Sequence, residues 1–260
     1  MSGIEGQLRQ VTAAIAPLRR IPVSDGALDT EALIGERVLV WEEQEGWARV
    51  TLLGDGYEGY MPVAALGEVA APTHRVSALR TFVYPGPSIK LPPLDALPFM
   101  GQVRVGALAD GFARIEREYG EGFVYAAHLT PAETPVGGDF VAVAERFLEV
   151  PYLWGGKSAL GIDCSGLVQL SLSAAGVEAP RDSGPQREGL GEELPAGAAL
   201  RRGDLVFWPG HVGILRDAQT LLHASGHHMT VVSEPFVQAV ERIRAQTGHD
   251  IAVARRIRDQ

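Results

Sequence analysis

The sequence predicts an α+β chain in which two small β-barrels precede a domain of mixed helices and strands. Three observations predict it: a weak internal repeat in the first half, a change from alternating to helical spacing of apolar residues after Gly138, and apolar strand patterns from Leu205 onward. The chain has 260 residues, of which 46% are hydrophobic, enough to fill more than one core. We therefore expect two or three domains.

The repeat aligns GERVLVWEEQEGWARV, from Gly35, with GQVRVGALADGFARI, from Gly101. In each copy a glycine opens an alternating apolar strand, and a glycine–aromatic pair, Gly46-Trp47 or Gly111-Phe112, opens the next strand. Each copy therefore indicates one small β-barrel. A single larger β-domain is the alternative interpretation.

The third domain is expected to begin with a helix behind Asp139, a suitable N-cap residue, and this helix should end before Pro151. A second helix is predicted over residues 164–175, between Asp163 and Gly176. Strands should dominate from Leu205 onward. The predicted divisions are an N-terminal segment at 1–16, a first barrel at 17–70, a second barrel at 71–133 and the mixed domain at 134–260.

Charge and hydropathy predict neither nucleic acid nor a membrane as a partner. The net charge is -9, and no run of Lys or Arg is dense enough to follow a phosphate backbone. No stretch reaches the roughly 18 apolar residues of a membrane-spanning helix, and the apolar stretch at 11–16 is too short for a signal peptide. We therefore expect a cytoplasmic protein, and the oligomeric state stays open.

The single cysteine, Cys164, excludes an intrachain disulfide and a multi-cysteine zinc site. It lies where a glycine-rich loop becomes a helix, and the free N–H groups of a helix start should favour the thiolate. The small residues Gly161, Ser165 and Gly166 leave room for a substrate backbone, and nearby N–H groups could hold an oxyanion. Cys164 is therefore the predicted nucleophile, and a buried structural thiol is the alternative.

The predicted base comes from the segment RRGDLVFWPGHVGILRDAQTLLHASG, in which His211 and His223 belong to two apolar strands. If the hairpin closes around Asp217, the two histidines lie opposite each other with Cβ atoms about 5 Å apart, or somewhat farther apart if the register slips. His211 would then accept the Cys164 proton while His223 orients it. Ordinary strand histidines remain the alternative, as does a simple helix cap for Asp163.

A metal site built from His223, His227 and His228 is a weaker possibility, because neighbouring residues of a strand point to opposite sides. The residues therefore call for no metal and no cofactor.

Residues 139–260 resemble the NlpC-type cell-wall peptidases, which are papain-like cysteine endopeptidases that cut murein stem peptides. The matching residues are Tyr152, Trp154-Gly155-Gly156, DCSGLV from Asp163, RDSGPQ from Arg181, GDL from Gly203, HVG from His211, and His223. The resemblance implies a papain-like domain with a catalytic triad of Cys164, His211 and His223. It also implies that Tyr152 lies beside the thiolate and near the oxyanion site.

The two repeats resemble bacterial SH3-like domains, so the implied fold is two SH3-like barrels followed by the peptidase domain. Together with the RDSGPQ string they look most like the branch that hydrolyses γ-D-glutamyl–diamino acid bonds in short peptides with a free N-terminal L-alanine. In that branch the first barrel narrows the cleft and helps bind the substrate amine. The implied substrate-binding residues are Glu36 and Tyr57 of the first barrel with Trp154, Asp163, Ser165, Arg181, Asp182 and Ser183.

The expected function is therefore that of a cytoplasmic endopeptidase that recycles murein-derived peptides. Two alternatives stay open. The same Cys–His scaffold could serve an acyltransferase or an amidase, because a fold does not choose the acyl acceptor. A non-catalytic module could use its barrels to hold wall peptides. The sequence leaves open which diamino acid follows D-glutamate and what the second barrel does.

Overall fold

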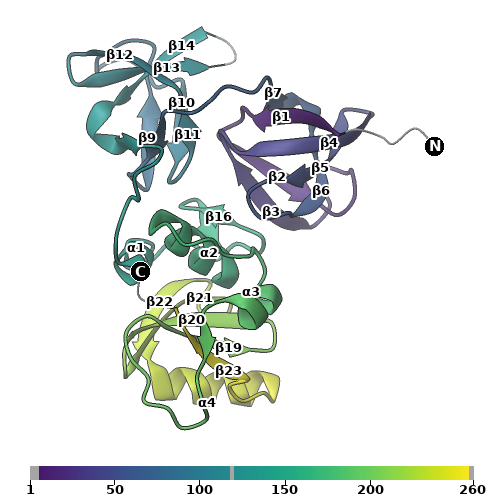
Figure 1. Cartoon of the computed structure of the whole chain (residues 1–260), viewed down its shortest axis with the longest axis vertical. Helices are drawn as coiled ribbons and strands as arrows, with labels where there is room; N and C mark the ends of the chain where they lie inside the picture. Colours follow the sequence, from purple (N-terminus) through teal and green to yellow (C-terminus); the bar gives the residue numbers. More distant parts are fainter. Residues whose placement is uncertain (1–5, 118–119, 258–260) are drawn as a thin grey trace. The chain divides into compact units, whose positions relative to one another are not determined.

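The structure is a computed structural model that describes residues 6–117 and 120–257. The chain forms two compact units, Met1–Val136 and Gly137–Gln260. The first unit is built almost entirely of strands, whereas the second has helices on both faces of a sheet (Figure 1).

The first barrel is a seven-stranded antiparallel sheet in the order β3-β2-β6-β5-β4-β1-β7. Its elements are β1 (Gln7–Val11), β2 (Ile15–Arg19), β3 (Leu28–Leu33), β4 (Arg37–Gln44), β5 (Trp47–Leu52), β6 (Glu58–Pro62), the 3₁₀ helix η1 (Val63–Ala65) and β7 (Leu66–Gly67). Burial alternates along β5, where Ala48, Val50 and Leu52 face the core. The inward-facing residues form a small apolar core inside the barrel.

The barrel begins earlier than predicted. Strand β1 pairs with both β4 and β7, and Val11 and Ala16 are buried in the core. The prediction of a separate segment over residues 1–16 is therefore wrong from Gln7 onward, while residues 1–5 lie outside the described residues. Only the second half of β1 is buried, which leaves little alternation for the sequence to reveal.

The second barrel repeats the end of the first, with a three-stranded meander followed by a 3₁₀ helix and a short strand. Its elements are β8 (His74–Val76), β9 (Arg80–Val83), β10 (Asp95–Pro98), β11 (Gln102–Val103), β12 (Val105–Ala109), β13 (Phe112–Arg117), β14 (Gly120–Tyr125), η2 (Ala126–His128) and β15 (Leu129–Pro131). The hairpin turns between β4 and β5 and between β12 and β13 also have the same backbone conformation. Glu45-Gly46 and Asp110-Gly111 have φ values of 51°, 81° and 51°, 80°, as in type I′ hairpins.

The two barrels approach each other closely at Gly35 and Gln102. The Gln102 N–H donates to the Ile34 carbonyl at 2.8 Å, and a Cβ atom on Gly35 would lie 2.5 Å from the Gln102 Cβ. Gly35 also has a φ of +87°, so a side chain is excluded here on two grounds. The contact therefore depends on this glycine.

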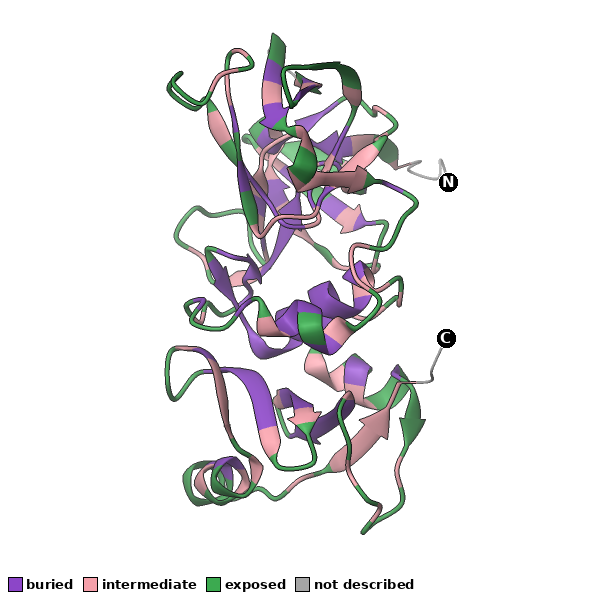
Figure 2. Cartoon of the chain, turned by 90° about the vertical axis from the view of Figure 1, so that its left-hand side faces the viewer, coloured by how far each residue is buried: buried purple, intermediate pink, exposed green. Residues whose placement is uncertain are grey.

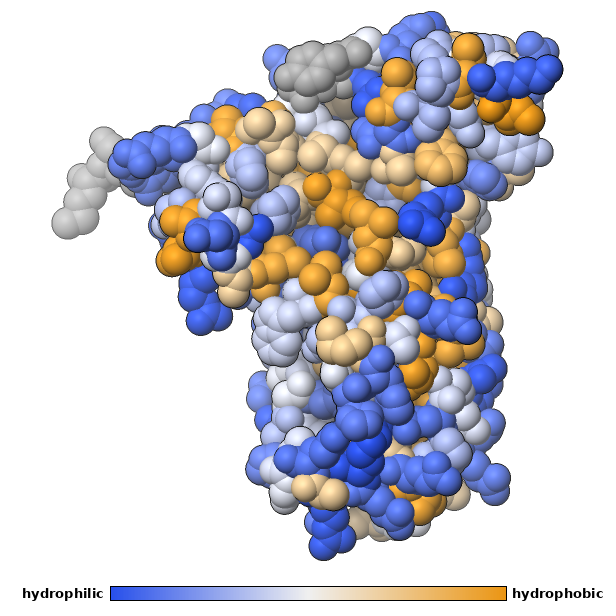
Figure 3. Space-filling model, turned by 180° about the vertical axis from the view of Figure 1, so that it is seen from behind, coloured by the Kyte–Doolittle hydropathy of each residue, from blue (hydrophilic) through white to orange (hydrophobic). Residues whose placement is uncertain are grey.

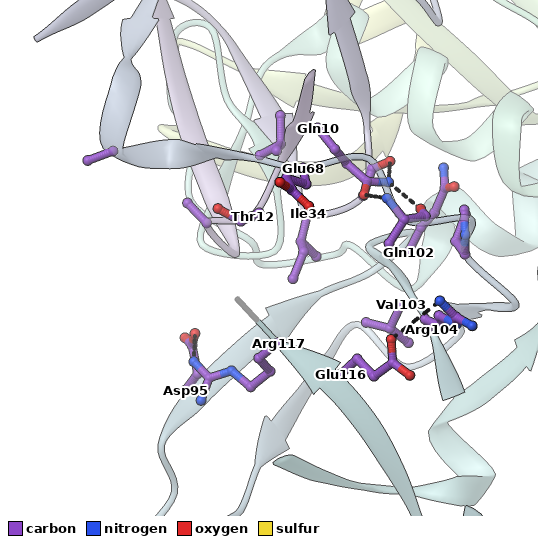
Figure 4. Close-up of a pocket in the computed structure, with 16 residues that line it drawn as sticks. Gln10, Thr12, Ile34, Glu68, Asp95, Gln102, Val103, Arg104, Glu116 and Arg117 are labelled. Atoms are coloured by element: carbon purple, nitrogen blue, oxygen red, sulfur yellow. Dashed lines mark hydrogen bonds and ion pairs between the residues drawn. The ribbon is translucent and has the colours of Figure 1, made fainter. Parts of the chain in front are cut away.

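A pocket of about 530 Å³ lies beside this contact, between the barrels (Figure 4). Arg117 pairs with Asp95 at 3.1 Å and Arg104 with Glu116 at 3.6 Å along its wall. On the other side, the Gln10 amide donates to the carbonyls of Gly35 and Ala70. Neither Glu36 nor Tyr57, the residues predicted to bind the substrate amine, lines this pocket.

The second unit is a six-stranded antiparallel sheet with helices on both faces, in the strand order β18-β23-β19-β20-β21-β22. Its elements are α1 (Phe140–Glu145), β16 (Lys157–Ser158), β17 (Gly161–Ile162), α2 (Cys164–Ala174), α3 (Ser183–Gly189), β18 (Glu192–Glu193), β19 (Asp204–Trp208), β20 (His211–Asp217), β21 (Thr220–Ser225), β22 (Thr230–Pro235), α4 (Phe236–Thr247) and β23 (Val253–Arg256). Helices α1 and α2 cover one face and α4 the other (Figure 1). Buried residues run along the strands and along α2 (Figure 2).

Two of these helices follow the prediction. Asp139 caps α1 by accepting the N–H groups of Val141 and Ala142, and Asp163 caps α2 by accepting that of Gly166. The amphipathic helix α4 was not predicted, since strands were expected to dominate after Leu205. It packs on Val206, Leu215 and Leu221 of the sheet.

The surface of the second unit, the lower part of the view in Figure 3, is mostly hydrophilic with scattered apolar side chains. No helix within residues 6–117 or 120–257 combines the length and apolar content needed to cross a bilayer.

Candidate active site

Cys164 is the first residue of α2, and its side chain is buried with 7% exposure. The backbone N–H groups of Ser165 and Val212 lie close enough to its sulfur to lower the pKa of the thiol, so the start of β20 lies beside the start of α2. His211 is the neighbour of Val212 and the first residue of that strand. The structure thus brings the predicted nucleophile and the predicted base to the same place.

Burial favours the neutral form of the Cys164 thiol. Burial and the carboxylate of Asp163 together raise the pKa of Cys164 to about 12, although the N–H groups of Val212 and Ser165 and the charge of Arg181 oppose the shift. The N–H of Ser165 at the helix start lowers the pKa, which is the predicted direction, but its effect is smaller than that of burial. Desolvation outweighs the helix N-terminus, and the proton must be removed by a neighbouring base.

Asp163 is the centre of a buried network that holds the loop before α2. Its carboxylate accepts hydrogen bonds from the N–H groups of Gly155 at 2.9 Å and Gly166 at 2.7 Å and from the Ser165 hydroxyl at 3.2 Å. Arg181 adds two charge-assisted bonds at 2.8 and 2.9 Å. A substrate ammonium would therefore have to share a carboxylate that already accepts five hydrogen bonds from four residues.

Arg181 braces this network from behind. Its guanidinium is 1% exposed and donates to Asp163, to the Ser165 hydroxyl at 2.9 Å and to the Gly156 carbonyl at 3.3 Å. The prediction that Arg181 contacts the substrate is therefore corrected, because burial removes it from the surface that a peptide could reach.

The other residues of the RDSGPQ string differ in burial and in their contacts. The Gln186 amide donates to the carbonyls of Ser165 and Pro180 at 2.9 and 2.8 Å, which fastens α3 to the first turn of α2. Asp182 is exposed and Ser183 half-buried at the start of α3, so both remain accessible to a ligand. Trp154 is also open to solvent, with 67% exposure.

His211 and His223 contact each other, although the predicted register is wrong by two residues. Leu215 pairs with Leu221 and Ile214 with Leu222, and a bulge separates Leu215 from Asp217. Continuing this register places Gly213, and not His211, opposite His223. The histidines therefore meet diagonally, with His211 Nε2 2.7 Å from His223 Nδ1.

Both imidazoles are buried bases that resist protonation. Burial, together with His223 and Arg242, lowers the pKa of His211 to about 3, although the charge of Glu234 opposes the shift. Burial also lowers the pKa of His223, although Glu234 partly offsets the shift. The resting pair is thus a neutral thiol beside a neutral imidazole, a state in which His211 can accept a proton.

Glu234 of β22 is a neighbour of the histidines that sequence reasoning missed. Its Oε1 lies 2.7 Å from His223 Nε2, and it also pairs with Arg242 of α4. The signal was an acidic residue within the apolar strand pattern VVSEPF, but the pairing of β21 with β22 could not be read from it.

Tyr152 lies at the same site. Its N–H donates to the Met229 carbonyl at 2.9 Å, and it forms a parallel bridge to Ile162, two residues before Cys164. Burial, with Cys164 and the carboxylate of Asp163 nearby, raises the pKa of its hydroxyl, which therefore remains a hydrogen-bond donor.

Glu36 and Tyr57 belong to the other unit, so their prediction as amine-binding residues stays a prediction. Glu36 is partly buried between β3 and β4, and Tyr57 packs against the first barrel's core. Tyr57 also lines a surface groove of about 420 Å³ with Arg20, Asp29 and Arg49. Within the described residues, no three His, Cys, Asp or Glu side chains are arranged to hold a metal ion.

Comparison with known proteins shows which family the chain belongs to. The NlpC/P60 family profile matches residues 149–244, and the profile of the bacterial dipeptidyl-peptidase SH3 domain matches residues 18–66. A γ-D-glutamyl-L-lysine dipeptidyl-peptidase of Bacillus subtilis is 30% identical over 226 residues, covering 77% of this chain and 73% of that protein. The chain belongs to the NlpC/P60 family.

Two further proteins agree with this assignment. The γ-D-glutamyl-L-lysine dipeptidyl-peptidase of Bacillus cereus is 31% identical, covering 70% of this chain and 60% of that protein. The crystal structure of an NlpC/P60 family protein from Bacillus cereus has a TM-score of 0.80 at 23% identity, covering 96% of this chain and 99% of the other. This last likeness shows a shared fold.

As an NlpC/P60 member, the chain is a cysteine peptidase with a papain-like domain. Tyr152, Cys164, His211, His223 and Glu234 all fall inside the 149–244 match.

Proposed function

We propose that this cysteine peptidase hydrolyses the bond between γ-D-glutamate and a diamino acid in short murein peptides with a free N-terminal L-alanine. The observation that carries the proposal is the contact of the Cys164 sulfur with the Val212 N–H, which places the thiol beside the hydrogen-bonded pair His211–His223. The names of the two Bacillus relatives support the substrate class, because both describe γ-D-glutamyl-L-lysine cleavage by those proteins.

The first half of the reaction forms a thioester. The Cys164 sulfur attacks the γ-carbonyl carbon of D-glutamate while His211 takes the thiol proton. The N–H at the start of α2 and the Tyr152 hydroxyl are the donors for the oxyanion. The intermediate then collapses, His211 gives its proton to the diamino-acid nitrogen, and this amine leaves.

The second half restores the enzyme. A water molecule attacks the thioester carbonyl while His211 takes one of its protons. The C–S bond breaks, the thiolate of Cys164 takes the proton back, and the dipeptide L-Ala-D-Glu leaves. His223 keeps the ring of His211 oriented throughout, through their 2.7 Å hydrogen bond.

We further propose that the substrate must carry a free N-terminal amine. A dipeptidyl-peptidase removes two residues from a free N-terminus, and both Bacillus relatives bear this name. Glu36 and Tyr57 of the first barrel and Ser165 beside the nucleophile are the proposed partners of the ammonium group. Such peptides are products of wall turnover, so we propose a role in murein recycling. The cytoplasmic location stays a prediction, which fractionation of native cells with an antibody to this chain would test.

The decisive experiment digests four peptides with the full chain: L-Ala-γ-D-Glu-L-Lys and L-Ala-γ-D-Glu-meso-diaminopimelate, each free and N-acetylated. Leaving a buried charge unpaired costs about 3–5 kcal/mol, so acetylation should lower kcat/KM at least about a hundredfold. In ¹⁸O-labelled water, the released dipeptide should gain one heavy oxygen, as hydrolysis requires. Transfer of the acyl group to an added amine instead would favour the acyltransferase.

Variants separate the parts of the proposal. Cys164→Ala should lower turnover more than about a thousandfold while the protein stays folded. Glu36→Gln should weaken discrimination between free and acetylated peptides. Tyr57→Phe should act more mildly, by about 1 kcal/mol. Glu42→Gln on exposed β4 is the matched control. Equal cleavage of free and acetylated peptides would contradict the amine requirement.

A further inference from the structure

Three residues cross three neighbouring strands along one diagonal. Gly213 lies opposite His223, which leaves His211 two residues away along β20. In the β21–β22 pair, Glu234 lies opposite Leu221, which is two residues before His223. Glu234 is therefore displaced from His223 by two residues, in the direction opposite to the displacement of His211. The same offset in both pairs puts His211, His223 and Glu234 in line on one face of the sheet. Diagonal neighbours of this kind are within reach of long side chains.

The charge of Glu234 determines where the protons of this line are. Burial raises the pKa of Glu234, but the hydrogen bond and charge of His223 and the charges of Arg242 and His228 bring it down to about 2. The carboxylate is therefore ionised at neutral pH and can only accept a hydrogen bond. At 2.7 Å from Glu234, His223 Nε2 must carry the proton.

The proton positions then follow along the line. A neutral His223 with its proton on Nε2 has a bare Nδ1, so this atom accepts a hydrogen bond from His211 Nε2 across 2.7 Å. A neutral His211 with its proton on Nε2 in turn has a bare Nδ1. This atom is the one free to take the proton of the thiol.

We propose that Glu234 is a positioning residue that fixes the tautomers of His223 and His211, so that His211 Nδ1 is the base facing Cys164. The assignment rests on the roles of Cys164 and His211 in the proposed function. Glu234 also stabilises the positive charge that His211 gains when it takes the thiol proton. Arg242, which pairs with Glu234 from α4, opposes this stabilisation.

The groups around Glu234 are consistent with this task. His223 contacts it along the line, Arg242 reaches it from α4, and the half-exposed His228 has its Nε2 3.7 Å from Glu234 Oε2. The Glu234 side chain is 14% exposed, so its interaction with the histidines is only weakly screened by solvent. Because Glu234 contacts His223, it acts on His211 through His223.

The test uses the full chain and reads the thiol directly. Because Cys164 is the single cysteine, its alkylation by iodoacetamide can be followed by intact mass from pH 5 to 10 without any substrate. Glu234→Gln keeps an acceptor oxygen but removes the charge, whereas Glu234→Ala removes both. Arg242→Gln removes the opposing charge, and Glu241→Gln removes an exposed charge from the same helix as a control.

General-base assistance is worth about 10²–10⁴-fold, so losing part of it should slow alkylation at pH 7 about tenfold in Glu234→Ala. Glu234→Gln should lie between this variant and wild type. In both variants the deficit should narrow toward pH 10, where hydroxide takes the proton. Arg242→Gln should react at least as fast as wild type, and Glu241→Gln at the same rate. With L-Ala-γ-D-Glu-L-Lys, the Glu234 variants should lower kcat with KM nearly unchanged.

A purely structural role predicts a different pattern. If Arg242→Gln slows alkylation as much as Glu234→Gln, or if neither Glu234 variant differs from wild type, the proposal is overturned. If Glu234→Ala fails to fold, the alkylation rates of Glu234→Gln and of the double variant Glu234→Gln/Arg242→Gln still test the proposal. The alkylation result also stands if wild type cleaves no γ-glutamyl peptide, a failure that would concern the proposed function alone.

Discussion

Gly213 faces His223 across the β20–β21 pair, where a Cβ atom on the glycine would lie 3.3 Å from the Cβ of the histidine. The same Cβ would lie 2.6 Å from Leu221 Cδ1. The diagonal contact between His211 and His223 crosses this position. The missing side chain at residue 213 therefore gives the two imidazoles the space in which to meet.

Gly213→Ala should damage activity more than stability. The added methyl group forces Leu221 or His223 to move, and such overpacking costs about 1–3 kcal/mol. A shifted His223 no longer holds His211, so kcat should fall at least about tenfold. Urea unfolding and peptide hydrolysis measure the two effects. In the control Gly138→Ala, no heavy atom of the described residues lies within 4 Å of the new Cβ, and both quantities should match wild type.

His211→Ala should be more damaging than His223→Ala, because the base takes part in every proton transfer while His223 orients it. His223→Asn and His223→Gln should retain more activity than His223→Ala, since either amide oxygen can accept the His211 N–H. Steady-state kinetics with the free tripeptide ranks the four variants. A larger loss in His223→Ala than in His211→Ala would reverse the assigned roles.

Arg181→Met should destabilise the second unit strongly. The change leaves the Asp163 carboxylate buried without its counter-charge, which costs about 3–5 kcal/mol. The double variant Asp163→Asn/Arg181→Met removes both charges and should recover part of this loss. Chemical denaturation of the two variants measures the difference. Equal stability of the single and double variants would show that the pair contributes little.

Stability should fall as the solution becomes acidic, in a window that the buried histidines define. His211 has a folded pKa of about 3 against an ordinary value of 6.5, so between these values the unfolded chain binds a proton that the folded chain does not. Glu234, lowered from 4.5 to about 2, acts in the same direction at lower pH. Stability is therefore full above pH 6.5 and declines below it.

Urea midpoints measured from pH 8 to pH 4 test this dependence. His211→Gln has no group that titrates in the window at this position, so its curve should be flatter than that of wild type. Parallel curves for the two proteins would mean that His211 is protonated in the folded state near its ordinary pKa.

The sequence predicted those parts of the site that depend on local chemistry. Asp163 as a helix cap, Cys164 at the start of α2 and the alternating strands of the barrels follow from patterns within a few residues. The long-range features were out of reach. The bulge after Leu215 changed the register of the histidines, and the partnership of Glu234 with His223 depends on how β21 pairs with β22.

Burial was the other quantity that the sequence did not reveal. The charged side chain of Arg181 is typical of a substrate-binding residue. Its buried position behind Asp163 is known only once α3 is packed on α2. The effect of burial on the pKa of Cys164 was also out of reach, because desolvation depends on everything that surrounds the thiol. Helix α4 was missed because its residues were read as a continuation of the strands.

The solitary thiol has a consequence for oxidative damage. A peroxide that reaches the sulfur of Cys164 produces a sulfenic acid, which many proteins protect by forming a disulfide with a second cysteine of the same chain. This chain has no second cysteine. Repair must then come from a thiol outside this chain that reaches the buried sulfur. Without such a thiol, further oxidation to the sulfinic acid inactivates the enzyme permanently.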